Sequence, residues 1–464
     1  MLILKKAIAI PITHDEVNTI ATSHTSFYDI ITYKDPVPNN HIFNTLLIKI
    51  NQIIFGNSLI AARLHNVLFF IPFYIFTVLL SSLAFRDSWI RAGFTLTVIL
   101  QPYLLDFFSV TRGYGLSLAF LMVSLYYVVM YERKKSMKLL VLAEISGVLG
   151  VYANLTLLNY FIPIQALIFY LNLSTFYTSQ RQTFWKTILI QLVSILVLGL
   201  LMIFPILKMT STDQFVYWGS TGFFSDTVVA LVSSLKYTAT YFNWTKQTNA
   251  LLVVGIIIIT ISLGIGIGLY HQHRQKSILY LSVTTLFLVL VYNALQFYIL
   301  KIPFLNARTS LFFVPISMLP FFASIDVIQI YFKKVGTWMT FLLIVFITHH
   351  FIITFQEKNV FEWWFDENTF EVLDDVQKDA TASQITTPIM IDCSWLFQPS
   401  LSYHGDQCCK STIQIVPYHK DPNANSDAIY YYATSDEAPS LDSSYHKIKE
   451  YGWGSRILFK KNGK

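Results

Sequence analysis

The sequence predicts a mainly α-helical, polytopic membrane protein that ends in a small extracytoplasmic α/β domain. Three observations lead to this fold class. The 464-residue chain is 54% hydrophobic and only 13% charged, whereas soluble domains carry about 25% charged residues. Apolar stretches long enough to cross a bilayer recur up to residue 355. Beyond that residue the chain turns polar, and helix-like runs alternate with strand-like runs.

The apolar part of the chain predicts about ten membrane spans, because a spanning helix needs about 20 mainly apolar residues. They cover residues 59–85, 92–105, 114–131, 139–153, 157–173, 187–207, 250–269, 278–300, 309–330 and 337–355. Residues 1–12 are too short to span and contain Lys5 and Lys6. They also lack the apolar core and cleavage site of a signal peptide. We interpret them as the outer end of a truncated first helix, followed by an outer loop at residues 13–58.

The basic loops predict the orientation, because short cytoplasmic loops carry an excess of lysine and arginine. The basic loops contain Arg86, Arg91, Arg133, Lys134, Lys135, Lys138, Arg181, Lys186, Arg274, Lys276, Lys333 and Lys334. With ten spans, all of these loops fall on one side, which we assign to the cytoplasm. The loops at 13–58, 106–113, 208–249 and 301–308 then lie outside, together with the C-terminal segment. This arrangement predicts a multi-pass protein of the plasma (inner) membrane of a bacterium.

The chain therefore divides into a transmembrane domain at residues 1–355 and a soluble extracytoplasmic domain at residues 356–464. The second domain has a helix-like run at 368–380 and strand-like runs at 389–392, 412–416, 428–433 and 456–460. About 100 residues are enough for a hydrophobic core of its own. All three cysteines, Cys393, Cys408 and Cys409, lie in this domain. Outside the cytoplasm, a disulfide from Cys393 to Cys408 or Cys409 and three free thiols are both open.

Two adjacent acids, Asp15 and Glu16, stand at the outer mouth of the truncated first helix. A carboxylate at a membrane boundary is costly unless it is hydrated, paired or used in chemistry. Glycosyl transfer to a hydroxyl or amine requires a base near the acceptor, and a carboxylate at the outer surface suits this task. The alternative interpretation is an ordinarily solvated acid pair at a helix end.

Cations stand at two outer loops. Arg112 follows Asp106 in the turn before Tyr114, and its planar donor fork suits a phosphate. Lys301 and Arg308 flank a second outer loop before a helix start, where the helix dipole also favours anions. These positions run against the positive-inside bias. The alternative is that the side chains reach lipid headgroups and bind no substrate.

The sequence assigns no certain cofactor, no metal ligands and no nucleic acid. His14, His24 and His41 could surround a divalent metal together with Asp15 or Glu16, but their spacing matches no metal-binding motif. A compact basic stripe with interleaved aromatic residues is absent from the sequence, which argues against nucleic-acid binding. Membrane lipids are the partners that the composition itself implies.

The order of these motifs resembles a known family. The segments are Asp15-Glu16, Asn40-His41, Phe55-Gly56-Asn57-Ser58, Arg63-Leu64, Arg112-Gly113-Tyr114-Gly115-Leu116 and Asn306-Ala307-Arg308 with Pro315. The set resembles the GT-C glycosyltransferases, and above all the family 39-like branch that includes protein O-mannosyltransferases and lipid A aminoarabinose transferases. The resemblance covers residues 11–315.

The resemblance implies a GT-C-like bundle and an inverting transfer from a polyprenyl-phosphate-sugar donor on the outer face of the membrane. The acceptor would be a lipid, a glycan or a protein. Asp15 would act as the base or orient the acceptor, and Glu16 would support it. Arg112 and Arg308 would hold the lipid phosphate, and His41 would line the site.

Asp106, Tyr114 and Lys301 join the expected substrate-binding residues because they share the two outer cationic loops. The sequence departs from the family pattern at Ile42 and Phe43, which replace the two prolines after Asn-His. The incomplete first helix is a second departure, and it concerns how Asp15 is anchored.

Two alternatives belong to other functional classes. A transporter or flippase would show paired charges within its spans and inverted repeats. The sequence has Glu144 within a span but no internal repeat. The second alternative is a truncated, inactive relative of the glycosyltransferases.

Overall fold

The structure is a computed structural model, and it describes residues 1–37, 39–177, 181–212, 219–237, 278–385, 388–419, 427–441, 443–452 and 454–463. The chain forms two compact units. The helical unit consists of Thr25–Gly56 and Ala61–Phe355, and the α/β unit consists of Met1–His24, Asn57–Ile60 and Gln356–Lys464.

The described residues include seven helices that are long and apolar enough to cross a membrane. The long helices are α5 (Leu59–Ala84), α8 (Gly113–Lys134), α10 (Leu158–Phe176), α11 (Arg181–Ser211), α14 (Ile278–Leu300), α15 (Phe313–Tyr331) and α16 (Lys333–Thr354). Helices α6 (Ser88–Ile99) and α7 (Pro102–Ser109) are long and apolar enough only as a pair, which is bent by 54° and forms either a broken span or a re-entrant loop. The predicted polytopic helical fold class is therefore confirmed.

Two of the predicted spans differ from the single long helices. The span predicted at 92–105 is the bent pair, since Pro102 begins α7 after the extended residue Gln101 and has no N–H to continue a helical ladder. The span predicted at 139–153 is α9 (Met137–Ala153), which has 17 residues. The span predicted at 250–269 lies outside the described residues.

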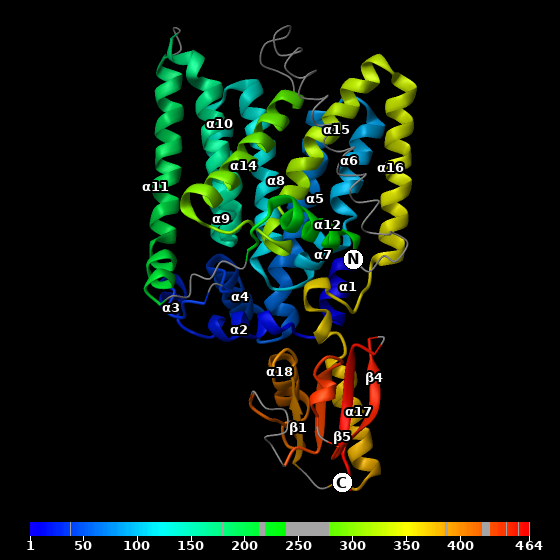
Figure 1. The fold of residues 1–464 in the computed structure, drawn as a ribbon. Coiled ribbons are helices and arrows are strands. Elements are labelled where there is room, and N and C mark those ends of the chain that lie inside the picture. The colour runs from blue at the N-terminus through cyan, green and yellow to red at the C-terminus, as the bar shows by residue number, and fades with distance from the viewer. Residues whose placement is uncertain are drawn as a thin grey trace. The chain divides into compact units, whose positions relative to one another are not determined.

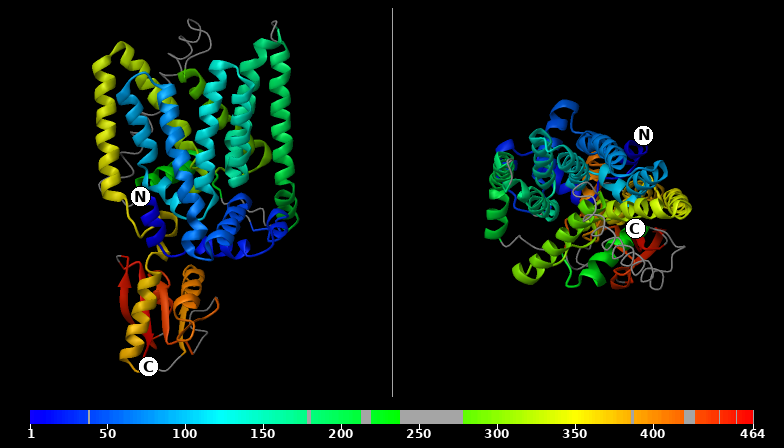
Figure 2. Two further views of the ribbon diagram at one scale, coloured as in Figure 1. Left: turned by 180° about the vertical axis from the view of Figure 1, so that it is seen from behind. Right: turned by 90° about the horizontal axis from the view of Figure 1, so that it is seen from above.

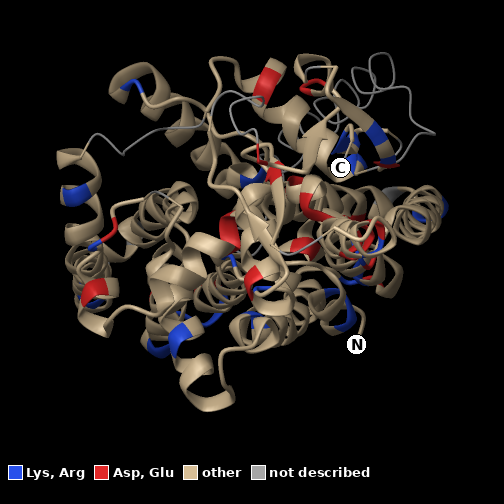
Figure 3. Cartoon of the chain, turned by 90° about the horizontal axis from the view of Figure 1, so that it is seen from below, with Lys and Arg blue, Asp and Glu red and all other residues tan. Residues whose placement is uncertain are grey.

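Helix α8 forms the centre of the helical unit. In the apolar 18-residue stretch of α8, 72% of the residues are buried, against 28% in that of α11 and 22% in that of α16. Figures 1 and 2 show α11 and α16 at opposite edges of the bundle, with α8 between them. The outer faces of α11 and α16 expose large aliphatic and aromatic side chains, as lipid-facing helices require. Charged residues are sparse along the ribbon (Figure 3).

Short helices connect the spans of this unit. They are α3 (Phe27–Ile31), α4 (Ile42–Phe55), the π-helical turn η2 (Phe223–Val228), α12 (Val229–Lys236) and the 3-10 turn η3 (Ala307–Ser310). Helix α4 contacts both α8 and α9, and α12 contacts α7 and η3. Helix α4 ends at Gly56, whose φ of +82° favours glycine. These contacts bring the loops that carry the candidate residues against the central helix.

The α/β unit contains a five-stranded mixed sheet in the order β2-β1-β3-β5-β4. Its elements are α1 (Leu2–Ala9), α2 (His14–Ser23), η4 (Phe361–Asp366), α17 (Thr369–Ala382), β1 (Ile389–Cys393), α18 (Gln398–Cys408), β2 (Ile413–Ile415), β3 (Tyr430–Thr434), η5 (Ala438–Ser440), β4 (Tyr445–Tyr451) and β5 (Arg456–Lys461). Strand β1 pairs in parallel with β2 and β3, whereas β5 pairs antiparallel with β3 and β4. The predicted small C-terminal α/β domain is confirmed.

The core of this domain forms where α17 and α18 pack on the sheet. Val372, Val376, Leu401 and Ile391 are all buried there. Strands β1 and β3 read as nearly continuous buried runs, which is typical of strands covered on both faces. The domain therefore has a hydrophobic core of its own.

The cysteines pair differently from the expected bridge. Cys393 is a buried free thiol in strand β1, because its side chain belongs to the domain core. Cys408 and Cys409, at the end of α18, are joined to each other. The bridge from Cys393 to Cys408 or Cys409 is thus not formed.

The N-terminal residues group with the C-terminal domain. The sequence division placed residues 1–355 in one domain, whereas the compact α/β unit includes Met1–His24 and Asn57–Ile60. Helix α18 contacts α2 directly. Asp15 and Glu16 therefore belong to the α/β unit, and the other candidate residues belong to the helical unit.

Candidate functional site

A buried arginine marks the candidate site in the helical unit. Arg112 is only 1% exposed and stands at the N-cap of α8. Its Nη1 donates to the carbonyl of Asn39 at 3.0 Å, and its Nη2 donates to the Asn39 side-chain oxygen. A guanidinium remains charged in a protein and carries five donors. Its position at a helix N-terminus adds a dipole of the same sign. The corner before α8 is therefore a positive site within an apolar bundle.

Two glycines allow the chain to turn at this corner. A Cβ on Gly113 would lie 1.9 Å from the carbonyl oxygen of Ala153, at the end of α9. A Cβ on Gly115 would lie 2.5 Å from the carbonyl oxygen of Phe107. Only glycine fits where two backbones approach so closely. The sequence Arg112-Gly113-Tyr114-Gly115 thus presses the start of α8 against α7 and α9.

The structure brings three predicted site residues together. His41 is the N-cap of α4, and its ring meets Tyr114 edge-on with 5.4 Å between ring centroids. The Tyr114 ring also contacts Phe107 at 5.0 Å. His41 and Arg112 flank the same turn, because the Cβ position of Gly113 lies 3.0 Å from the His41 Cβ. Segments that are 70 residues apart in sequence therefore form one site.

A network of buried hydrogen bonds supports the turn that carries Arg112. Asn44 Nδ2 donates to the carbonyl of Thr111 at 3.1 Å, and its Oδ1 accepts from Asn66 at 3.0 Å. His65 Nε2 lies 2.9 Å from the same Asn44 oxygen, and its Nδ1 lies 3.1 Å from Asn51. The network joins α4, α5 and the residue before Arg112. Sequence reasoning missed these residues, although polar side chains on apolar helices were an available signal.

Tyr33 holds the loop that faces Arg112. Its hydroxyl lies 2.6 Å from the carbonyl oxygen of Val37 and 3.1 Å from that of Asn40. The residue has a φ of 54°, which is uncommon for a bulky side chain. Burial raises the pKa of the Tyr33 hydroxyl, and the nearby Arg112 charge opposes that rise. No pattern in the sequence predicted the role of Tyr33.

Asp106 lies on α7 on the other side of the corner. It is fully buried and accepts a hydrogen bond of 2.9 Å from the hydroxyl of Tyr237, which follows α12. Asp106 is thus linked to α12, and the contact between the tilted rings of Phe107 and Tyr114 links its helix to the Arg112 turn. That Asp106, Arg112 and Tyr114 bind the substrate together stays a prediction.

Lys301 and Arg308 lie on the second cationic loop. Lys301 is exposed, and its Nζ donates to the carbonyl of Tyr298 at 3.0 Å. Arg308 lies in η3, which is closed by the N–H of Asn306 donating to Thr309 Oγ1 at 2.8 Å. Because α12 contacts both η3 and α7, this loop is joined to the Asp106 helix through α12. No described contact places Lys301 at the Arg112 turn.

Asp15 and Glu16 form the first turn of α2 in the α/β unit. Glu16 is fully buried, and its Oε2 accepts the N–H of Thr13 at 2.9 Å. This contact is one half of a capping box and fixes the start of the helix. Glu16 therefore has a structural task beside Asp15. Negative side chains at this end of α2 are also favoured by the helix dipole.

A third acid lies close to this pair. Asp366 is 2% exposed and ends η4. Burial raises the pKa of Asp366 well above its usual range, and the charges of Glu16 and Asp15 raise it further. The N–H of His14 and the charge of Arg456 act in the opposite direction. The described residues contain no group of three or more His, Cys, Asp or Glu side chains arranged to hold a metal ion.

Comparison with known proteins gives structural likenesses alone. No family model matches the chain, and no curated protein matches it. The structure is similar to the crystal structure of ArnT from Cupriavidus metallidurans in the apo state, with 10% identity, a TM-score of 0.47, and coverage of 98% of this chain and 95% of that one. It is also similar to the same enzyme bound to undecaprenyl phosphate, with 10% identity, a TM-score of 0.46, and coverage of 99% and 95%. The sequence identity and the TM-scores are too low to establish a family, so the family of the chain stays a prediction.

Proposed function

We propose that the chain is an inverting membrane glycosyltransferase. It takes a sugar from a polyprenyl-phosphate-sugar donor and transfers it to a lipid, glycan or protein acceptor on the outer face of the membrane. The observation that carries the proposal is the buried Arg112 at the start of α8, held against the polar loop before α4. The order of the sequence motifs, which resembles that of GT-C glycosyltransferases, supports it.

Arg112 suits a lipid phosphate for electrostatic reasons. Departure of the lipid phosphate from the sugar leaves negative charge on its oxygens, and preorganised cations stabilise that charge as it develops. A guanidinium in an apolar bundle acts more strongly than one in water, because the local dielectric constant is lower. The N-terminal dipole of α8 adds to the same field. Arg112 would thus bind the donor and favour its departure.

Asp15 would supply the second part of the reaction. An acceptor hydroxyl must lose its proton as the sugar bond forms, and a carboxylate within hydrogen-bond reach takes it. Inversion follows when the acceptor attacks the sugar on the face opposite the leaving phosphate. His41 and Tyr114 would line the donor site beside Arg112, and Arg308 would hold the phosphate with it.

One observation weakens the transporter alternative. Glu144, the acid within helix α9, accepts a hydrogen bond of 2.8 Å from the amide of Gln165. Gln165 in turn accepts from Gln191 at 2.9 Å. Glu144 is thus bonded to a pair of amide side chains, and the three residues join α9, α10 and α11. Such a network fits helix packing within a membrane.

The test is transfer of radiolabelled sugar from a panel of polyprenyl-phosphate donors, using membranes that contain the full chain. We expect Asp15→Asn to abolish transfer and to insert normally. Arg112→Ala should mainly raise KM for the donor, and Arg112→Lys should restore part of the affinity because it keeps the charge without the fork. Arg133→Ala, in the last turn of α8 and at the opposite end of that helix from Arg112, is the matched control. Full activity of Asp15→Asn would refute the proposal.

A further inference from the structure

The segment that carries Asp15 is bound to the C-terminal domain along its backbone. The N–H of Ile12 donates to Nε2 of His404 at 2.9 Å, and the carbonyl of Ile12 accepts from Ser400 Oγ at 2.7 Å. The N–H of His14 donates to Asp366 Oδ2 at 2.7 Å. All of these partners lie more than 350 residues away in the sequence. Both polar groups of Ile12 and the N–H of His14 are thus satisfied by side chains of one domain.

The His14 side chain fixes the same segment a second time. Its Nδ1 lies 3.0 Å from the carbonyl oxygen of Leu396, in the loop after β1. The ring stands edge-on to Trp395 at 5.6 Å and to Phe365 at 6.2 Å. The side chain of His14, the residue before Asp15, is therefore in contact with two separate segments of the domain.

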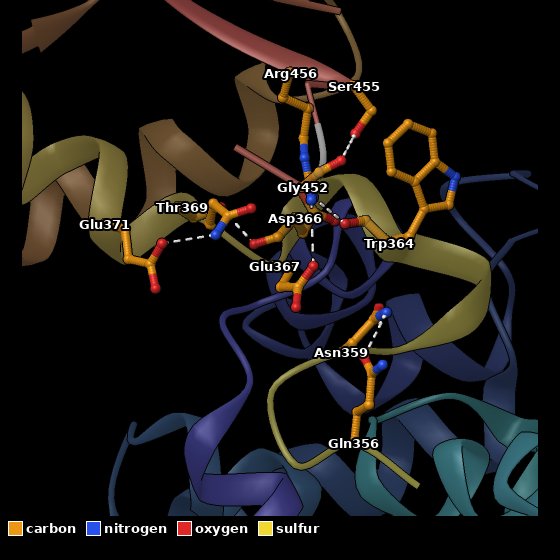
Figure 4. A network of polar contacts seen from close by, with 11 residues as sticks. Gln356, Asn359, Trp364, Asp366, Glu367, Thr369, Glu371, Gly452, Ser455 and Arg456 are labelled. Carbon is orange, nitrogen blue, oxygen red and sulfur yellow. Dashed lines mark hydrogen bonds and ion pairs between the residues drawn. The ribbon is translucent and has the colours of Figure 1, made fainter. Parts of the chain in front are cut away.

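The acceptor Asp366 is itself rigidly placed (Figure 4). Arg456 of strand β5 is buried, donates to the carbonyl of Trp364, and pairs with Glu367 at 3.2 Å. The guanidinium also lies over the Trp364 ring, 5.3 Å from its centroid. Residues on both sides of Asp366 are thus bonded to the sheet. The placement of Asp366, and of the His14 N–H that it binds, therefore depends on the sheet.

We propose that the C-terminal domain is the positioning element for Asp15, and that Asp366, Ser400 and His404 are its positioning residues. The inference rests on the proposed function, in which Asp15 acts on the acceptor. Asp15 lies in the first turn of α2, and the backbone just before it is held by side chains of the C-terminal domain. Asp366, Ser400 and His404 hold Ile12 and His14, which lie just before the base, and we assign them no contact with substrate.

The consequence for catalysis follows from the geometry. A reacting group must be held within about 0.5 Å of its productive position, and a displacement of about 1 Å can cost about 100-fold in rate. Loss of a positioning contact should therefore lower kcat by about 10- to 100-fold. KM for the donor should stay nearly unchanged, because the residues proposed to bind the phosphate belong to the helical unit.

The experiment combines hydrogen exchange with transfer kinetics on the full chain. Asp366→Ala removes the acceptor for the His14 N–H, whereas Asp366→Asn retains an oxygen in its place. Ser400→Ala removes the donor to the Ile12 carbonyl, together with a hydroxyl contact to Thr369, and serves where Asp366→Ala fails to fold. Asp374→Ala, on the exposed face of α17, and His446→Ala, on β4, are matched controls in the same domain.

We expect Asp366→Ala and Ser400→Ala to speed amide exchange in the peptide that spans residues 10–17 and to lower kcat at constant KM. Asp366→Asn should restore both readouts, and the two controls should change neither. Faster exchange with unchanged kcat would overturn the inference, and so would unchanged exchange in Asp366→Ala. Failure of the proposed function would show separately, as transfer that survives Asp15→Asn. In that case amide hydrogen exchange by itself tests whether the domain holds residues 10–17.

Discussion

Replacing Gly113 by alanine tests the geometry of the Arg112 corner most directly. The new Cβ would lie 1.9 Å from the carbonyl oxygen of Ala153 and 3.0 Å from the Cβ of His41. The first of these distances is about 1.5 Å short of the 3.4 Å at which such contacts become ordinary. The obstacle is backbone at the end of α9, which cannot rotate away as a flexible side chain would. Helices α8 and α9 must therefore separate.

The energetic cost can be bounded from known substitutions. Overpacking a well-packed interior costs about 1–3 kcal/mol, and the overlap at Gly113 places this variant in the upper part of that range. Gly199, in α11, is the matched control because no described atom lies within 4 Å of its Cβ position. Alanine there should stabilise the helix by up to about 1 kcal/mol, since glycine is a poor helix former.

The assay is thermal unfolding of the full chain in detergent, paired with donor titration in the transfer reaction. We expect Gly113→Ala to lower the unfolding temperature and to raise KM for the donor, because Arg112 is the preceding residue. Gly199→Ala should raise the unfolding temperature slightly and leave KM unchanged. Equal stability of Gly113→Ala and the wild type would show that α8 and α9 do not meet as described.

Three further predictions concern buried polar groups. Asn44→Ala should lower stability by about 1–3 kcal/mol, because the carbonyl of Thr111 loses its donor; chemical denaturation in detergent measures this, with Ile53→Ala, an exposed position on the same helix, as control. Tyr237→Phe should cost about 1.5–3 kcal/mol, since a buried carboxylate loses a hydrogen bond, and an unchanged unfolding temperature would contradict the Asp106 contact. Because burial raises the pKa of Asp366 above its ordinary value of 3.8, the folded chain keeps a proton that the unfolded chain releases. The contribution of Asp366 to the free energy of unfolding should therefore fall by about 1.4 kcal/mol per pH unit as the pH rises from about 4 to the raised pKa. Asp366→Asn should flatten this slope in unfolding measured from pH 4 to pH 8.

The sequence predicted the helical class and the C-terminal α/β domain because both depend on local composition. Apolar runs of span length are recognisable without any tertiary contact, and seven of the predicted spans are single long apolar helices. The bend after α6 was less accessible. Pro102 was visible in the sequence, but a proline within an apolar run can either kink a helix or begin a new one.

The candidate site was predictable only in part. Arg112, Tyr114 and His41 could be selected from their residue types and order, and the structure places them together. Asn44, His65 and Tyr33 were missed, because a buried hydrogen bond between distant segments leaves no periodic pattern in the sequence. The structure matches neither of the two cysteine arrangements left open by the sequence, for a related reason: the burial of the Cys393 thiol in a sheet depends on strand pairing.

The sequence by itself determined where the chain can enter a membrane, where it turns polar, and which side chains carry charge at the loops. Those properties follow from the transfer free energies of single residues and need no partner. Only the tertiary structure decided that residues 12–14 are bound by His404, Ser400 and Asp366. The physical reason is that a hydrogen bond selects its partner by position in space, and partners more than 350 residues apart meet only after the sheet and its helices have formed.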